Sequence, residues 1–383
     1  MTTMTLNDAS ESLRESMRMM NADFIERTQE VTGMMLALVA GEHVFLGGPP
    51  GTAKSRLIET VARASGASVF QRLLMRQTDP SELFGPTDVL GLREGRFERR
   101  IEGFLPTAEF AYLDECFKAN SAVLNGLLTA MNERVYDHGT KRIRIPLRML
   151  AGASNELPED DSLAALWDRF LLRFWVSPIT DEDRWSGLVF ETDSEPGEDV
   201  AINEKALAAA QSYVAAVGIG KDVVEAVIEI RSQLALQHGL ESSDRRWRKI
   251  AKLIRAHAVL MGRMTATPAD LRVLNWSLWD RPEDIPAIAG VVAAHGNPKL
   301  AAAQRLWESA REKMQAVDLR KAPVQDLANL SQGLKLVLGE AASQLAAFDM
   351  EDEDADRLVD EIRQWSRSVL VQSKRMLKMA TRS

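Results

Sequence analysis

A glycine- and proline-rich segment follows the short apolar run Val44-Phe45-Leu46, and its sequence is Gly48-Pro49-Pro50-Gly51-Thr52-Ala53-Lys54-Ser55. When a buried strand ends in such a loop and a helix begins after it, backbone N–H groups of the loop and of the first helical turn face a bound anion. The segment therefore predicts a phosphate-binding loop, although on its own it is also compatible with an ordinary strand-to-helix turn. We expect Lys54 to contact the β- and γ-phosphates of a nucleotide, and Ser55 to bind Mg²⁺.

Ala53 stands where the usual pattern of this loop has glycine. A Cβ at this position is harmless if φ is negative, but it costs about 1 kcal/mol if φ must be positive. The departure predicts a loop that is distorted and still able to bind phosphate.

A second motif, Phe110-Ala111-Tyr112-Leu113-Asp114-Glu115, is an apolar run that ends in two adjacent acids. It is typical of a buried parallel strand whose carboxyl end lies where α/β sheets bind ligands. Without the phosphate loop, such an acidic pair would more often belong to a solvated loop or a helix N-terminus. With the loop, we expect Asp114 to hold the Mg²⁺ that Ser55 contacts, and Glu115 to polarise the water that attacks the γ-phosphate.

A third apolar run, Arg148 to Asn155, follows a helix-like stretch from Asn120 to Asn132. This alternation of strand and helix favours an α/β fold with a parallel sheet and helices on both faces. If the strands ending at Asp114 and Asn155 are neighbours, Asn155 could orient the attacking water or contact the γ-phosphate. Taken singly, Asn155 also fits a turn or helix cap, and Arg169, which lies between apolar residues further on, fits a structural salt bridge.

Length and composition set wider limits on the fold and on the partners. The 383 residues are enough for two or three domains, and 45% apolar with 27% charged residues is typical of a soluble globular chain. A net charge of −8 argues against a surface that coats nucleic acid generally, although a local basic groove is compatible with it. The N-terminus has no signal-like segment and no run approaches the roughly 20 apolar residues that span a bilayer, so we expect a cytoplasmic protein.

Cys116 is the single cysteine, so the chain forms no intramolecular disulfide, which fits a reducing compartment. Its neighbours Asp114 and Glu115 are expected to raise the pKa of its thiol, which favours a small buried residue over a nucleophile.

Taken together, these motifs resemble a known family. The phosphate loop, Asp114-Glu115, Ser154-Asn155 and Trp167-Asp168-Arg169-Phe170, in this order and at these intervals, resemble the AAA+ ATPases and, within them, the MoxR group. Four further stretches are similar to its RavA-type branch: Glu82 to Pro86, Gly103 to Pro106, Leu127 to Glu133, and Ala153 to Pro158. An Ala-Lys-Ser ending of the loop is usual in MoxR proteins. The resemblance covers about residues 20 to 280 and is less clear beyond them.

The resemblance implies ATP and Mg²⁺ as ligands, with sensor 1 at Asn155 and an arginine finger at Arg169 that is supplied to the neighbouring subunit's nucleotide. Ser243 to Trp247 is similar to the sensor 2 segment, which implies that Arg245 contacts the γ-phosphate from the lid, with Arg246 as the second choice. Arginine suits both roles because its planar fork stays charged and binds phosphate oxygens in pairs. A homo-oligomeric ring, most simply a hexamer, follows from the resemblance.

Two segments are expected to form hairpins. Asp88 to Leu92 and Arg96 to Ile101 flank a turn that contains Gly95, and Val135 to Asp137 and Lys141 to Ile145 flank a second turn. In the resembled family these loops face the pore and are candidates for handling the client, whereas their basic residues also fit the protection of an edge strand. His138 fits a turn residue better than a metal ligand.

The resemblance and the helical periodicity predict three domains. They are an αβα nucleotide domain at 1–190, an all-α lid at 200–280 and a C-terminal helical bundle at 281–383, with a polar linker at 191–199. Expected helices in the second and third domains cover 203–217, 221–237, 244–263, 268–279, 300–317, 324–348 and 355–379. The acidic cluster from Asp349 to Asp354 fits a solvated bend or, less simply, a surface that binds a partner.

Three functions are compatible with the sequence. The first is an oligomeric ATPase that remodels a protein client beside a partner with a von Willebrand factor A domain, as the resemblance implies, with no nucleic acid bound and no insertion into a membrane. The second is a nucleic-acid motor, because related ring helicases share the core; salt-dependent DNA affinity would reveal it. The third is a scaffold gated by nucleotide. A Glu115→Gln variant that traps ATP yet keeps the function of the client would favour the scaffold.

Overall fold

The computed structural model describes residues 4–158, 160–190, 200–296, 298–319, 322–345 and 353–380. The chain divides into two compact units. Unit 1 comprises Met1–Glu225 and Gly239–Ile285, and unit 2 comprises Ala226–His238 and Pro286–Ser383. The expected linker at 191–199 and most of the acidic cluster, 349–352, lie outside the described residues. The predicted domain boundaries stay predictions.

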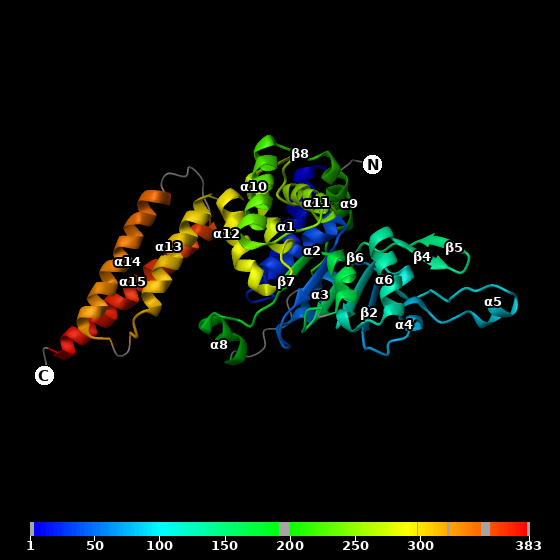
Figure 1. The fold of residues 1–383 in the computed structure, drawn as a ribbon, viewed down its shortest axis with the longest axis horizontal. Helices are drawn as coiled ribbons and strands as arrows, with labels where there is room; N and C mark the ends of the chain where they lie inside the picture. Colours follow the sequence, from blue (N-terminus) through cyan, green and yellow to red (C-terminus); the bar gives the residue numbers. More distant parts are fainter. Residues whose placement is uncertain are drawn as a thin grey trace. The chain divides into compact units, whose positions relative to one another are not determined.

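Unit 1 is built on a five-stranded sheet with the strand order β2-β3-β6-β1-β7 (Figure 1). Its strands are β1 (His43–Gly47), β2 (Val69–Leu73), β3 (Phe110–Asp114), β6 (Met149–Ser154) and β7 (Phe170–Trp175). All neighbouring strands pair in parallel. The two apolar runs that precede polar motifs, β3 and β6, lie side by side and are almost wholly buried, as strands with helices on both faces require. The predicted α/β fold is confirmed.

Helices pack against this sheet and connect its strands. Helix α2 (Thr28–Ala40) contacts β1 and β7, and α3 (Lys54–Ala64) contacts β3 and β6. Gly33 of α2 allows close packing, because a Cβ there would lie 2.0 Å from the ring of Phe174. The remaining connections are α4 (Pro80–Phe84), α5 (Val89–Arg93), α6 (Ser121–Glu133), α7 (Ala164–Arg169) and α8 (Glu182–Phe190). Short 3₁₀ turns lie at Leu105–Thr107, Cys116–Lys118 and Asp161–Leu163.

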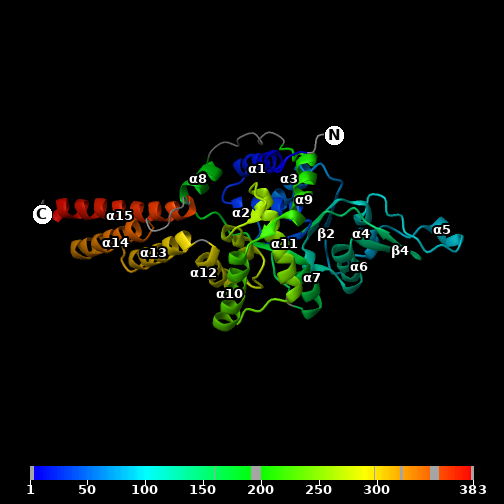
Figure 2. The ribbon, with the colours of Figure 1, turned by 90° about the horizontal axis from the view of Figure 1, so that it is seen from above.

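The remainder of unit 1 is mostly helical and includes a buried ionic cluster. Helices α1 (Leu6–Ala22), α9 (Glu204–Tyr213) and α11 (Asp244–Leu260) pack together and against α2, as Figure 2 shows from above. The predicted helix at 268–279 is instead a 3₁₀ helix, Pro268–Trp276. Burial by itself would raise the pKa of Asp270, but hydrogen bonds from His257 and Arg263 lower it to about 2. This cluster fixes the 3₁₀ helix to the end of α11.

The remaining short elements of unit 1 are 3₁₀ turns at Val214–Ala216 and Pro282–Asp284 and a pair of two-residue strands, β8 (Gly218–Ile219) and β9 (Thr265–Ala266). Helix α10 (Lys221–His238) begins in unit 1 and continues into unit 2.

Of the two expected hairpins, the second is present and the first is wrong. Strands β4 (Val135–His138) and β5 (Lys141–Arg144) pair antiparallel, as predicted. In the first segment, a single bridge joins Thr87 to Arg99, and Val89–Arg93 is the helix α5. The carboxylate of Asp88 accepts a hydrogen bond from the Leu90 N–H, which starts the helix. Most side chains of this segment are exposed, so no buried face selects a strand there.

Unit 2 ends in a bundle of three helices. These are α13 (Pro298–Gln315), α14 (Val324–Leu345) and α15 (Glu353–Ala380), and they follow α12 (Ile285–Gly296). Leucine, isoleucine, valine and alanine side chains form the core between the three helices. The rings of Trp307 and Trp365 lie 5.6 Å apart, and Trp307 donates a hydrogen bond to Glu361. This agrees with the helical bundle expected from the periodicity. Within the described ranges, no helix is both long and apolar enough to cross a membrane.

A buried histidine joins the first residue of β1 to its neighbours. The Leu150 N–H donates to Nδ1 of His43 at 2.9 Å, so Nε2 carries the proton and donates to the Met131 carbonyl at 3.0 Å. The side chain is only 1% exposed. Burial, and then the positive charges of Arg134, Lys249 and Lys252, hold the pKa of His43 well below its usual 6.5.

We therefore expect the free energy of unfolding of unit 1 to fall as the pH drops below 6.5, the usual pKa that His43 regains on unfolding. The unfolded chain binds a proton there that the folded chain excludes, so the loss is about 1.4 kcal/mol per pH unit until the folded pKa is reached. Denaturant unfolding at about pH 7.5 and 5.5 measures it. A His43→Gln variant, whose amide can make both hydrogen bonds, should lose this part of the slope; an unchanged slope would contradict the assignment.

Candidate active site

The phosphate loop connects the last residue of β1 to the first residue of α3. Gly48 has a φ of +135°, and a Cβ there would lie 2.3 Å from the Val176 carbonyl oxygen, so only glycine fits. Gly51 has a φ of +80°. Ala53 has a φ of +66°. The positive φ is the unfavourable case for a residue with a Cβ, so the backbone at Ala53 is strained. Residues with positive φ, Gly48, Gly51 and Ala53, alternate with residues that have negative φ, and such alternation is typical of backbone that forms anion-binding concavities.

Lys54 lies across the mouth of this loop. Its Nζ donates to the carbonyl oxygens of Gly48 at 2.7 Å and Pro49 at 2.8 Å, and to Oδ1 of Asn155 at 3.0 Å. The side chain is 8% exposed. Burial lowers the pKa of Lys54 more than the carboxylates of Asp114 and Glu115 raise it. The ammonium group is held by neutral oxygens, which a phosphate with its full negative charge would outcompete.

Glu115 follows the end of β3 and shares Asn155 with the lysine. Because β3 and β6 are neighbours, the residues that follow them meet at one edge of the sheet. Asn155 Nδ2 donates to Glu115 Oε1 at 2.9 Å, Ser154 Oγ lies 3.4 Å from Oε2, and Lys118 Nζ lies 3.3 Å from Oε2. Glu115 has a φ of +49°, a strained conformation for a non-glycine residue. The structure thus brings Lys54, Asn155 and Glu115 into one hydrogen-bonded chain.

Ser55 and Asp114 lie on either side of a tyrosine that sequence reasoning did not select. The Tyr112 hydroxyl donates to Ser55 Oγ at 2.8 Å, and it also interacts with the carboxylate of Asp114. Tyr112 and Asp114 share a face of β3 because they are two residues apart, which is the signal that could have identified the tyrosine. A hydroxyl and a carboxylate are the hard oxygen ligands that suit Mg²⁺ with its remaining positions left to water and phosphate. These residues fit the metal.

The predicted arginine finger, Arg169, lies where the strands of the sheet begin, whereas the phosphate loop lies where they end. We call these the two opposite edges of the sheet. Arg169 immediately precedes Phe170, which pairs with His43 at the first residue of β1, whereas the loop follows the last residue of β1. A strand of this length separates the two edges by roughly 16 Å. Arg169 is partly buried, with Nη1 at 3.3 Å from the Ala165 carbonyl oxygen and 3.4 Å from Oδ2 of Asp168.

Arg245 lies beside Arg169 and away from the loop. Burial, and then the charge of Arg245, lower the pKa of Arg169. Arg245 is exposed, and its guanidinium donates to the side chain of Asn132 at the end of α6. Arg246 is only 4% exposed and donates to the carbonyls of Ser277 at 3.0 Å and Phe170 at 3.5 Å. Of the two arginines, Arg245 is therefore the more exposed one.

Arg27, at the residue before α2, supports the loop from behind. Its side chain is 6% exposed and donates to the Thr52 carbonyl within the loop. Nothing in the sequence marks it, because a single arginine before a helix is usually a solvated surface residue. Cys116, by contrast, is as expected: it is buried, and burial followed by the nearby carboxylates raises the pKa of its thiol.

His138 is also a turn-flanking residue, as expected, with its ring nitrogen 2.8 Å from the Arg99 carbonyl oxygen. Among the residues that the structure describes, no cluster of three or more histidine, cysteine, aspartate or glutamate side chains is placed to hold a metal.

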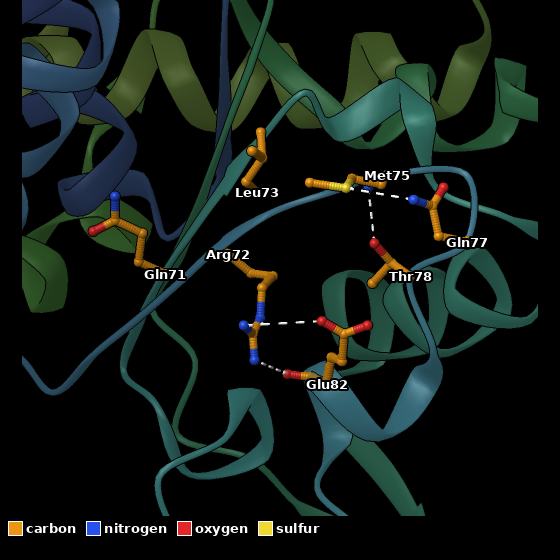
Figure 3. A pocket seen from close by; sticks show the side chains of 7 residues that line it. All are labelled: Gln71, Arg72, Leu73, Met75, Gln77, Thr78 and Glu82. Atoms are coloured by element: carbon orange, nitrogen blue, oxygen red, sulfur yellow. Dashed lines mark hydrogen bonds and ion pairs between the residues drawn. The ribbon is translucent and has the colours of Figure 1, made fainter.

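A cavity of about 320 Å³ lies elsewhere, along the edge strand β2 (Figure 3). Its lining includes Arg72 and Glu82, whose side chains point toward each other in the figure, and Arg72 also donates to the Glu82 carbonyl at 3.1 Å. These contacts attach β2 to α4. None of the predicted site residues lines this cavity.

A parallel sheet in this order, with a phosphate loop after β1, an acidic pair at the end of β3 and a polar pair at the end of β6, defines the AAA+ class of P-loop ATPases. The comparisons with known proteins agree. A family profile described as "MoxR domain in the MoxR-vWA-beta-propeller ternary systems" matches residues 11–202, and an AAA lid domain profile matches residues 222–292. The chain belongs to the MoxR family of AAA+ ATPases.

Individual relatives are consistent with this assignment. An uncharacterized protein of Methanocaldococcus jannaschii is 39% identical over 283 residues, which cover 74% of this chain and 73% of the relative. The chaperone MoxR1 of Mycobacterium tuberculosis is 33% identical over 168 residues, 42% of this chain and 43% of the chaperone. A crystal structure of a putative ATPase from Cytophaga hutchinsonii shares the fold, with a TM-score of 0.59 at 16% identity, over 76% of this chain and 96% of that one.

Proposed function

We propose that this chain hydrolyses ATP at the loop of Gly48 to Ser55 and uses the energy to remodel or activate a protein client. The observation that carries this proposal is the hydrogen-bonded chain from Lys54 through Asn155 to Glu115. It joins the group that would bind the γ-phosphate to the group that would polarise water, at one edge of the sheet. Such positioning supplies most of the catalysis in phosphoryl transfer.

Each residue has a defined role in this proposal. Lys54 binds the β- and γ-phosphates, while Ser55 and Asp114 hold Mg²⁺, which supplies charge neutralisation on the phosphates when bound. Glu115 accepts a hydrogen bond from the attacking water, and Asn155 keeps its carboxylate in place as sensor 1. Arrival of a phosphate would draw the Lys54 ammonium away from Oδ1 of Asn155, and the second N–H of the Asn155 amide, the one that does not bond Glu115, would donate to the γ-phosphate.

We further propose that Arg169 and Arg245 complete the site of a neighbouring subunit. They lie together at the edge of the sheet opposite their own loop, so neither reaches a nucleotide bound there without a large movement. Supplied in trans as finger and sensor 2, the pair makes hydrolysis depend on assembly. A homo-oligomeric ring, most simply a hexamer, satisfies this requirement at every site.

The family profile names ternary systems of MoxR, von Willebrand factor A and β-propeller proteins, and we propose partners of both kinds for this chain. The client would meet the loop that carries α5 and the hairpin of β4 and β5. These two lie together, since His138 of the hairpin hydrogen-bonds the Arg99 carbonyl of the other loop. Val89, Leu90 and Phe97 are 59%, 60% and 73% exposed there and offer an apolar contact for a polypeptide.

The test is an assay of phosphate release by the purified chain with ATP and Mg²⁺, beside a Glu115→Gln variant. The variant should retain nucleotide binding and lose about 10²- to 10⁴-fold in turnover, because a general base of this kind contributes that much. Equal turnover of both proteins would remove Glu115 from the mechanism. The same variant holds ATP and so serves as bait for the client. Capture of DNA in place of a protein would favour a nucleic-acid motor.

A further inference from the structure

Arg27 connects the phosphate loop to two other segments through main-chain carbonyl groups. Its Nε donates to the Thr52 carbonyl at 3.4 Å, Nη2 to the Ser177 carbonyl at 2.7 Å, and Nη1 to the Glu26 carbonyl at 2.8 Å. The side chain is 6% exposed. A buried guanidinium group spread over three backbone acceptors fixes the positions of all three segments relative to one another.

The contact with Thr52 determines the direction of the next amide. In a trans peptide the C=O and the following N–H point in opposite directions. Because the Thr52 carbonyl faces Arg27, the N–H of Ala53 points away from Arg27, on the other side of the peptide plane. An inward N–H at this place in the loop is one of the donors that a phosphate would use.

This same peptide precedes the strained residue of the loop. Ala53 has a φ of +66°, which costs about 1 kcal/mol for alanine and nothing for glycine. Without the hydrogen bond from Arg27, the Thr52–Ala53 peptide would rotate and relieve that strain. The N–H of Ala53 would then no longer point in the direction that binds phosphate. The hydrogen bond from Arg27 to the Thr52 carbonyl opposes this rotation.

Arg27 is itself anchored on the segment that follows β7. The neighbouring Glu26 has a φ of +55°, and its carboxylate accepts hydrogen bonds from the Thr180 N–H at 3.0 Å, the Thr180 hydroxyl at 3.2 Å and the Asp181 N–H at 3.0 Å. On the loop side, Gly48 packs directly against Val176. The guanidinium group is therefore held in a fixed position from which it donates its hydrogen bond to the loop.

We propose that Arg27 is a positioning residue that holds the phosphate loop in its binding conformation by compensating for the strain at Ala53. This inference rests on the proposed nucleotide site. It assigns to Arg27 a contribution to nucleotide affinity that depends on which residue occupies position 53.

The experiment measures binding of fluorescent ADP with Mg²⁺ to the full chain and to Arg27→Met, each with Ala53 or with Ala53→Gly. Arg27→Met should weaken ADP about ten- to a hundredfold when Ala53 is present, as expected for the loss of a charged donor. With Ala53→Gly the same change should cost several-fold less, because glycine holds the positive φ without strain. An equal loss in both backgrounds, or no loss in either, would overturn the proposal.

Arg134→Met is the matched control, since Arg134 also binds carbonyls, those of Gly41 at 2.8 Å and Arg148 at 3.4 Å, far from the loop. It should lower the melting temperature and leave ADP affinity unchanged. If Arg27→Met does not fold, Arg27→Lys gives the answer, because lysine keeps the charge but reaches fewer carbonyls; the same dependence on position 53 is expected. If the unmodified chain fails to bind ADP, the proposed function itself is wrong, and this inference falls with it.

Discussion

Replacing Lys54 with alanine is expected to abolish ATP binding at concentrations that saturate the unmodified chain. The ammonium group is the loop's own cation, and its Nζ lies 2.7 Å from the Gly48 carbonyl oxygen. Loss of a charge-assisted contact to phosphate in a partly desolvated site should weaken binding about a hundredfold or more. Equilibrium binding of labelled ATP with Mg²⁺ measures the change.

The fold should survive this substitution. Burial lowers the pKa of Lys54, which shows that the charged form is held at a cost when no anion is present. The melting temperature without nucleotide should therefore stay close to that of the unmodified chain. Lys249→Ala is a suitable control, because Lys249 is also partly buried and pairs with Glu42 at 2.7 Å, away from the loop. Unchanged affinity in Lys54→Ala would remove the loop from the nucleotide site.

Replacing Arg169 with alanine should leave ATP binding intact and suppress hydrolysis by about 10³- to 10⁵-fold, or roughly 4 to 7 kcal/mol in the barrier. The reason is position: Arg169 lies at the edge of the sheet opposite its own loop, so its removal leaves the nucleotide contacts of its own subunit unchanged. Steady-state phosphate release beside equilibrium binding separates the two effects.

Mixed assemblies decide whether the arginine acts in trans. Neither Arg169→Ala nor Glu115→Gln alone should hydrolyse ATP at a useful rate. When the two variants assemble together, some interfaces combine the intact Glu115 of one subunit with the intact Arg169 of the next, and activity should return. Assemblies that stay inactive would show that the finger lies elsewhere. Arg245→Ala should behave like Arg169→Ala in the same mixing experiment.

Much of the fold follows from local sequence patterns, because buried parallel strands are continuous apolar runs. In this chain three of these runs end directly at the polar motifs of the candidate site. The runs that end at Gly47, Asp114 and Ser154 are strands of one sheet for this reason. The proximity of Asn155 to Glu115 could be expected only conditionally, since it depends on which strands are neighbours. The order of the strands is a property of the whole sheet, and no short stretch of the sequence indicates it.

Other features depend on contacts between distant parts of the chain. Arg27 meets Thr52 and Ser177 only after folding, and an isolated arginine carries no sign of it. The segment with α5 has alternating residues but little buried surface, so local capping by Asp88 decides its conformation. The position of Arg245 beside Arg169 likewise follows from how α11 packs. The residues next to Arg245 in the sequence indicated a phosphate-binding arginine, but they did not indicate where it lies.

The placement of loop and arginines on opposite edges of one sheet has a consequence for assembly. If each subunit gives its arginines to the next, the contact is heterologous: two different faces meet, head to tail. An open row of subunits then always has one loop at one end without arginines, and one arginine pair at the other end without a loop. Closure of the row is the arrangement that completes every site, so under the proposed exchange of arginines a closed assembly is favoured over a filament.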